Sequence, residues 1–250
     1  MKRIKLEIAY DGTNYCGWQI QPELPTVEHE VNKALSGLLG KQIEVIGASR
    51  TDSGVHALGN VAVFDTDSRI PPDKFTLALN QRLPEDIRVQ SSMEVAHNFH
   101  PRKVNCVKTY KYRILNKRID LPTERYYSYF VYYPLSLGLM EKAGSYLIGE
   151  HDYKSFCSVK TQVTDTVRTI YDLNVTREDR DSDMITITVV GNGFLYNMIR
   201  IIAGTLIEVG RGALSPDDIP IMLKGLDRSL AGPTAPPEGL TLMKIDYGDK

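Results

Sequence analysis

Cysteine is scarce in this sequence, and Cys16, Cys106 and Cys157 are far apart and form no C-x-x-C motif. An odd number of widely spaced cysteines argues against a disulfide framework and against a cysteine zinc site. His97 and His100 form an H-x-x-H pair, but no glutamate adjoins it and the surroundings do not predict a helix. We therefore expect free cysteines and no metal site.

Long apolar runs are also missing. No stretch approaches the roughly 20 apolar residues that cross a bilayer, and residues 1–10 alternate charged and apolar side chains, unlike a signal peptide. We therefore expect no membrane contact and a cytoplasmic location. A hydrophobic content of 42% and a charged content of 24% indicate a folded globular chain, and 250 residues suit one large domain or two small ones.

The third absence is an excess of positive charge, because 30 basic residues are balanced by 31 acidic ones. A protein that coats nucleic acid would be far more basic, so any RNA binding here must be local. No acidic residue occurs between Glu94 and Asp120, whereas basic and aromatic residues alternate there. This pattern fits a surface that contacts phosphates and stacks bases, and it fits a solvated strand face equally well. The stretch contains Arg102, Lys103, Lys108, Lys111, Arg113, Lys117 and Arg118, with Phe99, Tyr110 and Tyr112.

Hydrophobic periodicity and turn residues predict a similar order of elements in each half of the chain. The first half is expected to contain strands at 4–10, 43–48, 61–64 and 87–95 and helices at 27–39 and 71–83. The second half is expected to contain strands at 108–115, 166–175, 184–190 and 240–247, a charged turn at 177–183, helices at 136–148 and 194–209, and a helix beginning at Ser215.

Each half thus reads roughly β-α-β-β-α-β, the split βαβ order that RNA-binding folds often use. We predict an α+β fold in which two RNA-recognition-like halves share a largely antiparallel mixed sheet. Helices are expected on one face, and an active-site cleft is expected between the halves. No Gly/Ser/Pro-rich linker occurs near residues 104–107, where we place the boundary between 1–105 and 106–250.

The segment from Ser49 to Ala57 is the most unusual part of the sequence. Asp52 follows Arg50 by two residues in a polar, glycine-containing loop between two predicted strands. A neighbouring arginine favours the ionised carboxylate, which can act as a nucleophile or general base. The alternative is that Asp52 caps a turn and pairs with Arg50, and a lone R-T-D-S-G motif would favour this alternative.

Two further features have both a functional and a structural interpretation. Tyr110 and Tyr112 lie on one face of a predicted strand, where they could stack on an extruded base or fill an aromatic core. Arg200 interrupts the apolar run 198–202, so it should either meet a carboxylate such as Asp52 or extend to the surface.

Taken together, these residues resemble the tRNA pseudouridine synthase A family over nearly the full length. The strongest match is Ser49–Ala57, which is similar to the family's R-T-D-x-G-V-H-A loop and places the catalytic aspartate on Asp52. Pro101 and Thr241 depart from the family pattern. The other similar segments are 10–19, 99–102, 108–114, 149–152, 155–156, 167–170, 193–200 and 237–240.

The resemblance implies an isomerase that converts uridine to pseudouridine at positions 38, 39 and 40 of the tRNA anticodon arm, with no cofactor and no metal. Asp52 would attack the sugar C1′ or remove a sugar proton, and Tyr110 would contact the flipped uracil. Arg50 and Arg200 would keep Asp52 ionised and oriented. The resemblance also implies a homodimer. The RNA backbone would be contacted by Arg102, Lys103, Lys108 and Lys111.

Two other classes of protein remain as alternatives. A non-catalytic RNA-binding module would explain the basic and aromatic stretch but gives Asp52 and Arg200 no purpose. A hydrolase using Asp52 and His56 would need a nucleophilic serine elbow or a metal set, and neither motif accompanies them. We expect His56 to act as a hydrogen-bonding residue of the loop.

Overall fold

The two ends of the chain belong to the same part of the molecule. A computed structural model describes residues 1–161, 163–177 and 182–248. The first unit contains Met1–Cys106 together with Leu242–Lys250, and the second unit contains Val107–Thr241. The expected halves were 1–105 and 106–250. The difference lies mainly in most of the C-terminal strand, from Leu242 on, which groups with the first unit.

The first unit is built on a sheet with the strand order β4-β1-β3-β10, and the short β2 also pairs with β3. Alternating burial along β1 places Ile4, Leu6 and Ile8 in the core, as the period-2 pattern predicts. β1 is antiparallel to β3 and to β4. The strands are β1 (Lys2–Tyr10), β2 (Ile46–Gly47), β3 (His56–Thr66), β4 (Ile87–Val95) and β10 (Leu240–Asp246).

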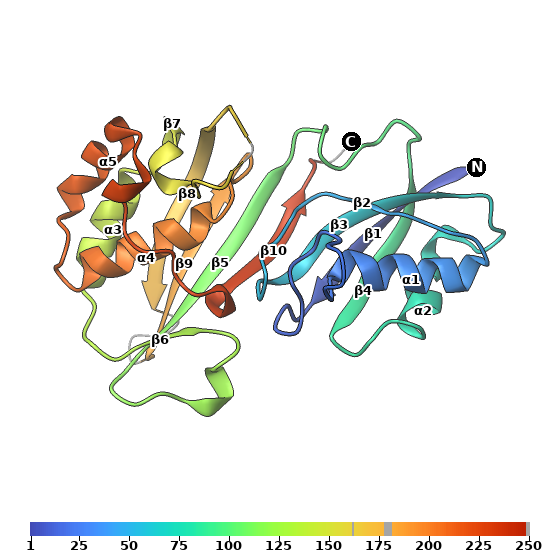
Figure 1. Cartoon of the computed structure of the whole chain (residues 1–250), viewed down its shortest axis with the longest axis horizontal. Helices are drawn as coiled ribbons and strands as arrows, with labels where there is room; N and C mark the ends of the chain where they lie inside the picture. Colours follow the sequence, from blue (N-terminus) through green and yellow to red (C-terminus); the bar gives the residue numbers. More distant parts are fainter. Residues whose placement is uncertain (162, 178–181, 249–250) are drawn as a thin grey trace. The chain divides into compact units, whose positions relative to one another are not determined.

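Two helices, α1 (Val27–Leu39) and α2 (Phe75–Asn80), pack beside each other against this sheet (Figure 1). The Phe75 ring of α2 meets the Phe64 ring of β3 edge-on at 5.3 Å, which fixes α2 on the core face. α1 ends where the sequence predicts, because Gly40 adopts φ 67° and its N–H bonds the Ser36 carbonyl at 2.9 Å.

The second unit is built on a sheet with the order β5-β9-β8-β7, to which β6 adds in parallel beside β5. The other pairs are antiparallel, so the predicted α+β class with largely antiparallel pairing is confirmed. Residues 178–181 of the expected charged turn lie outside the described residues. The strands are β5 (Val107–Asn116), β6 (Tyr129–Val131), β7 (Gly149–Asp152), β8 (Val167–Arg177) and β9 (Met184–Gly191).

Three helices complete the second unit: α3 (Leu137–Ser145), α4 (Met198–Gly210) and α5 (Ile219–Gly225). α4 is buried almost all round, as its apolar sequence predicts. It begins four residues later than expected, because Asn197 takes a left-handed φ of 61° before it. Short 3-10 turns occur at η1 (Pro72–Lys74), η2 (Pro122–Glu124), η3 (Lys154–Phe156), η4 (Pro216–Asp218), η5 (Arg228–Leu230) and η6 (Pro237–Gly239).

The predicted element order holds in the first unit and differs in the second, where β6 and β7 are additional strands and most of β10 lies with the first unit. The predicted helix start at Ser215 is confirmed by a capping box. The Ser215 N–H donates to the Asp218 carboxylate at 2.8 Å, and the Asp217 N–H donates to the Ser215 hydroxyl at 3.3 Å. No helix among the described residues is long and apolar enough to cross a membrane. The expected cleft between the halves stays a prediction.

Candidate active site

Asp52 lies on a loop between β2 and β3, which we call the Asp52 loop (residues 49–55). The loop is shorter than the polar segment in the sequence suggests, because His56 and Ala57 already belong to β3. Thr51 and Val55 are buried, whereas Asp52 itself is half-buried. The loop backbone is therefore covered, while the carboxylate-bearing residue remains accessible.

The residues that follow β1, which we call the opening turn (residues 11–19), hold the Asp52 loop through its backbone. Trp18 donates its backbone N–H to the Thr51 carbonyl at 3.1 Å. On the other side of Asp52, the Tyr15 carbonyl accepts the Gly54 N–H at 3.2 Å and the Ser53 hydroxyl at 3.3 Å. Hydrogen bonds to the opening turn thus flank Asp52 on both sides.

Two glycines allow this close approach of backbone to backbone. A Cβ atom on Gly12 would lie 2.1 Å from the Val55 carbonyl oxygen, and one on Gly17 would lie 2.5 Å from the Thr51 carbonyl oxygen. Gly17 also has φ +88°, which favours glycine. The glycines of the opening turn therefore have a steric purpose that the sequence motif alone does not reveal.

Side chains from the sheet hold the first part of the Asp52 loop. The Tyr10 and Thr51 hydroxyls share a buried hydrogen bond of 2.7 Å. The fully buried Asn60 amide donates to the Tyr10 oxygen at 3.2 Å and to the Ser49 carbonyl at 3.0 Å, and its oxygen accepts the Ser49 N–H at 3.3 Å. Sequence reasoning missed Asn60, although an amide beside the apolar residues 61–64 of a strand was a signal that something polar had to meet it.

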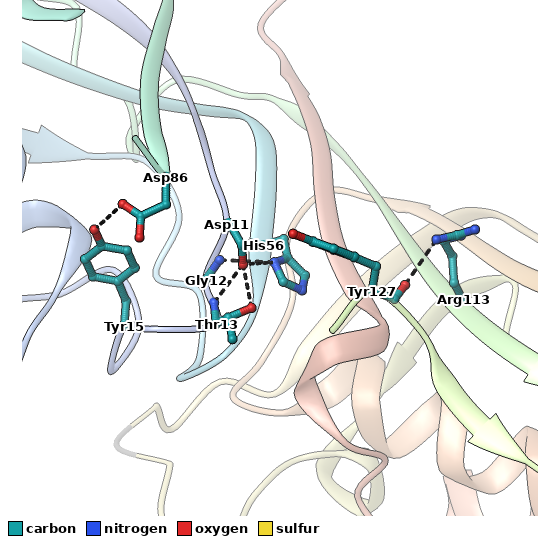
Figure 2. A network of polar contacts seen from close by, with 8 residues as sticks. All are labelled: Asp11, Gly12, Thr13, Tyr15, His56, Asp86, Arg113 and Tyr127. Atoms are coloured by element: carbon teal, nitrogen blue, oxygen red, sulfur yellow. Dashed lines mark hydrogen bonds and ion pairs between the residues drawn. The ribbon is translucent and has the colours of Figure 1, made fainter. Parts of the chain in front are cut away.

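His56 connects the start of β3 to the opening turn (Figure 2). Its buried Nδ1 accepts the Gly12 N–H at 3.0 Å and lies 3.1 Å from an Asp11 carboxylate oxygen. The bond from Gly12 needs a lone pair on Nδ1, and an ion pair with Asp11 needs a protonated ring, so the two belong to different protonation states. In both states His56 contacts the opening turn, as expected for a hydrogen-bonding loop residue.

Tyr15 is anchored by its hydroxyl, which donates to the Asp86 carboxylate at 2.6 Å (Figure 2). Burial and this hydrogen bond raise the pKa of Tyr15 well above its usual value. The Asp86 carbonyl in turn accepts the Asp11 N–H at 2.9 Å. Tyr15, whose carbonyl accepts hydrogen bonds from Ser53 and Gly54, is thereby held against the loop before β4.

Arg50 is exposed, and its expected role beside Asp52 stays a prediction. Its side chain is exposed and makes no hydrogen bond or ion pair with the residues that the structure describes. The local Arg50–Asp52 pair considered from the sequence is therefore not formed among the described residues. Two residues from Asp52, the Arg50 guanidinium is left available to solvent or to an anion.

The two tyrosines of β5 share a face, as predicted, and both are buried. Tyr112 is a core residue: burial raises its pKa well above the usual value, and its hydroxyl donates to the Pro236 carbonyl at 2.8 Å. Tyr110 meets the Phe194 ring edge-on at 5.3 Å. Lys111, between them in sequence, is exposed on the opposite face. The aromatic-core alternative thus applies to Tyr112, and the contact of Tyr110 with a uracil stays a prediction.

Arg200 lies in the first turn of α4 and is half-buried. Its Nε donates to the Ala235 carbonyl at 2.8 Å, and one terminal nitrogen donates to the Asn197 side-chain oxygen at 2.9 Å. The Ala235 N–H returns a bond of 3.0 Å to the Arg200 carbonyl. These bonds orient the guanidinium within the second unit, and its pairing with Asp52 stays a prediction.

The segment that holds Arg200 packs tightly on α4. A Cβ on Gly204 would lie 1.9 Å from the Pro233 carbonyl oxygen, and the Gly232 N–H bonds the Thr205 hydroxyl at 3.0 Å. Further along, a Cβ on Gly239 would lie 2.7 Å from the Tyr112 ring. Residues 232–235 therefore pack against α4, and Gly239 of the segment 237–240 packs against β5.

The proposed RNA-backbone residues fall on both units. Arg102 and Lys103 are exposed in the first unit, and in the second Lys111 is exposed and Lys108 is half-buried. Other members of the basic and aromatic stretch are engaged elsewhere. Arg113 pairs with Glu124 at 3.1 Å, and Phe99 meets the Tyr247 ring at 5.1 Å. Phe99 is therefore part of a packed pair and not an open stacking surface.

Comparison with known proteins identifies a family model that matches most of the chain and curated relatives that match nearly all of it. A family model described as tRNA pseudouridine synthase matches residues 7–102 and 143–248, which include the Asp52 loop, the opening turn and α4. This chain therefore belongs to the tRNA pseudouridine synthase family, and the family predicted from the sequence is confirmed.

Curated relatives of high similarity carry one name, tRNA pseudouridine synthase A. The protein from Ruminiclostridium cellulolyticum is 51% identical over 248 residues, with 99% of this chain and 100% of the relative covered. Those from Thermoanaerobacter sp. and Brevibacillus brevis are 47% and 46% identical over 247 residues, with the same coverage. The chain thus matches these relatives from end to end.

Proposed function

We propose that this chain is an isomerase that converts uridine to pseudouridine in the anticodon arm of tRNA, at positions 38, 39 and 40. The observation that carries the proposal is the half-buried Asp52 on a loop whose backbone is fixed on both sides, in a chain that belongs to the tRNA pseudouridine synthase family. A carboxylate held in this way is preorganised to act on a bound substrate.

The reaction breaks the bond between the sugar C1′ and the base N1, rotates the uracil, and joins C1′ to C5. The proton at C5 leaves to solvent and N1 gains a proton, so the reaction needs no oxidant and no transferred group. Asp52 begins the cleavage by attacking C1′ or by removing a sugar proton. The target uridine must leave its stack to be reached.

The other site residues act on the substrate or on Asp52. Tyr110 contacts the extruded uracil, and Arg200, oriented by Ala235 and Asn197, favours the ionised Asp52. The exposed Arg50, whose side chain has no partner among the described residues, contacts an RNA phosphate close to the target.

The RNA backbone is held by a small set of basic residues and not by net charge, which is −1. Exposed guanidinium and ammonium groups give a salt-dependent affinity that does not depend on sequence. The residues we assign to this role are Arg102, Lys103, Lys108 and Lys111.

Release of tritium from tRNA labelled at uridine C5 tests the activity without added metal or cofactor. We expect release with the wild type and none with Asp52→Asn, which keeps the shape of the side chain but not its charge. Asp67→Asn is the matched control, because this exposed carboxylate of the first unit pairs only with Lys41 among the described residues. Turnover by Asp52→Asn would end the catalytic assignment. Tight tRNA binding without release by the wild type would favour the binding-module alternative.

We also propose a homodimer in the cytoplasm as the working form. The dimer is what the resemblance to the family implies, and the cytoplasm is proposed because tRNA is a cytoplasmic substrate in bacteria and the curated relatives are bacterial. Sedimentation equilibrium at assay concentrations should give twice the chain mass of 28.1 kDa. A mass equal to that of one chain would contradict the dimer.

A further inference from the structure

The structure of the Asp52 loop raises the question of what sets the direction of Asp52 itself. Backbone groups of the opening turn bond the backbone of Thr51 and Gly54 and the hydroxyl of Ser53, but the side-chain contacts on the N-terminal side of Asp52 come from the sheet. Those contacts are made by Tyr10 at the end of β1 and by Asn60 within β3.

A register irregularity brings these two residues to the same place. Ile8 is opposite Asn60, but Tyr10 is opposite Ala57, so β3 has one extra residue over this interval. Such a β-bulge redirects side chains and is common beside active sites. Here it puts the small, buried Ala57 opposite Tyr10 and leaves Leu58 54% exposed. The Tyr10 and Asn60 side chains are then both buried and within hydrogen-bond distance of each other.

Both the nitrogen and the oxygen of the Asn60 side-chain amide form hydrogen bonds with the backbone of Ser49. Its nitrogen donates to the Ser49 carbonyl and its oxygen accepts the Ser49 N–H, a pairing that needs a donor and an acceptor on one side chain. The Tyr10 hydroxyl extends this network to Thr51, the residue directly before Asp52. Because Asn60 is fully buried and Tyr10 is 4% exposed, loss of either partner would leave polar groups unsatisfied.

We propose that Tyr10 and Asn60 are positioning residues for catalysis, which act through Thr51 and Ser49 to hold Asp52 in its reactive orientation. The inference rests on the proposed function of Asp52. Rotation of the Asp52 loop would break buried hydrogen bonds, so the network favours a single loop conformation. The sheet, and not substrate binding, then determines where the carboxylate points.

The test removes single oxygen atoms from the network. We expect Tyr10→Phe and Thr51→Val each to lower the single-turnover rate at saturating tRNA by ~10- to 100-fold, the cost of a small misplacement of a catalytic group. The Kd for tRNA should stay within about twofold, because the network is buried. Thr51→Ser, which keeps the hydroxyl, should retain nearly the full rate. The double variant should be no slower than the slower single variant, since both lose the same bond.

Tyr153→Phe is the matched control for a merely structural effect. Tyr153 is a fully buried tyrosine of the second unit whose hydroxyl donates to the Leu147 carbonyl at 2.5 Å. The Tyr153→Phe variant should have a lower Tm than the wild type but the same single-turnover rate per folded molecule. An equal loss of rate in Tyr153→Phe, or an equal loss in Thr51→Ser and Thr51→Val, would overturn the positioning role.

Asp52→Asn, measured beside these variants, separates the two proposals. Turnover by Asp52→Asn would mean that the proposed function is wrong. An inactive Asp52→Asn together with a wild-type rate in Tyr10→Phe and Thr51→Val would refute the positioning role alone. If Tyr10→Phe does not fold, Thr51→Val gives the same test from the loop side of the hydrogen bond.

Discussion

Gly12 offers the sharpest test of the contact between the opening turn and the Asp52 loop. An alanine Cβ at this position would lie 2.1 Å from the Val55 carbonyl oxygen, whereas real Cβ atoms keep at least 3.0 Å from such neighbours. The two segments must therefore separate by roughly 1 Å, a displacement that can lower a catalysed rate by about 100-fold. Overpacking of this kind also costs about 1–3 kcal/mol, or about 2–12 °C in Tm for a chain of this size.

We would measure tritium release and the Tm of Gly12→Ala beside those of Gly37→Ala. Gly37 lies inside α1 and an added Cβ there meets nothing within 4 Å, so the same substitution should leave the rate unchanged. It should also raise stability by about 0.5–1 kcal/mol, because alanine is the better helix former. A wild-type rate and Tm in Gly12→Ala would show that the opening turn does not support the Asp52 loop as we describe.

Three further predictions concern stability and RNA affinity. Tyr112→Phe removes the hydrogen bond to Pro236 and should lower stability by about 1 kcal/mol, and an unchanged Tm would contradict this. The hydrogen bond from Arg3 lowers the pKa of Asp65, so this pair stabilises the fold above the unfolded pKa of about 4 and less as pH falls through the folded pKa. In urea titrations, the free energy of unfolding should therefore fall less between pH 7 and pH 3 in Asp65→Asn than in the wild type. An equal fall in both would exclude the Arg3–Asp65 pair as a cause. Arg102→Gln should reduce the slope of log Kd against log salt by about 1, and an unaltered slope would remove it from the RNA contacts.

Local signals in the sequence predicted much of the first unit. The alternation of β1 and the cap at Gly40 are determined by residues close in sequence, and β1 and α1 appear where those residues predict. The late start of α4 was missed, because the apolar pattern alone set the predicted start and the left-handed backbone that asparagine tolerates at Asn197 was not considered. Only contacts between residues far apart in the sequence place most of the last strand with the first unit.

The candidate site was predictable in part. The sequence singled out Asp52 by its unusual setting, but the loop is held by Tyr15 and Tyr10, which form bonds across 38 and 41 positions and had no local signal. Asn60, which bonds across 11 positions, had one, as a polar residue in an apolar strand. Arg50 was assigned to Asp52 by proximity in sequence, and its side chain is exposed, so this assignment stays a prediction. Proximity along a loop does not determine which way two nearby side chains point.

The pairing of β10 with β3 has a consequence for how the protein is made. A ribosome completes β3 early, but it adds β10, which pairs with β3, only after β4 to β9 and helices α2 to α5 have been made. During most of synthesis, the mostly buried strand β3 of the nascent first unit therefore has an edge that only the two-residue β2 can cover, and the rest of that edge is a site for incorrect pairing with other chains. A nascent chain stalled shortly before Leu240 would contain every residue of the proposed site and yet would lack the strand that completes the sheet beneath it.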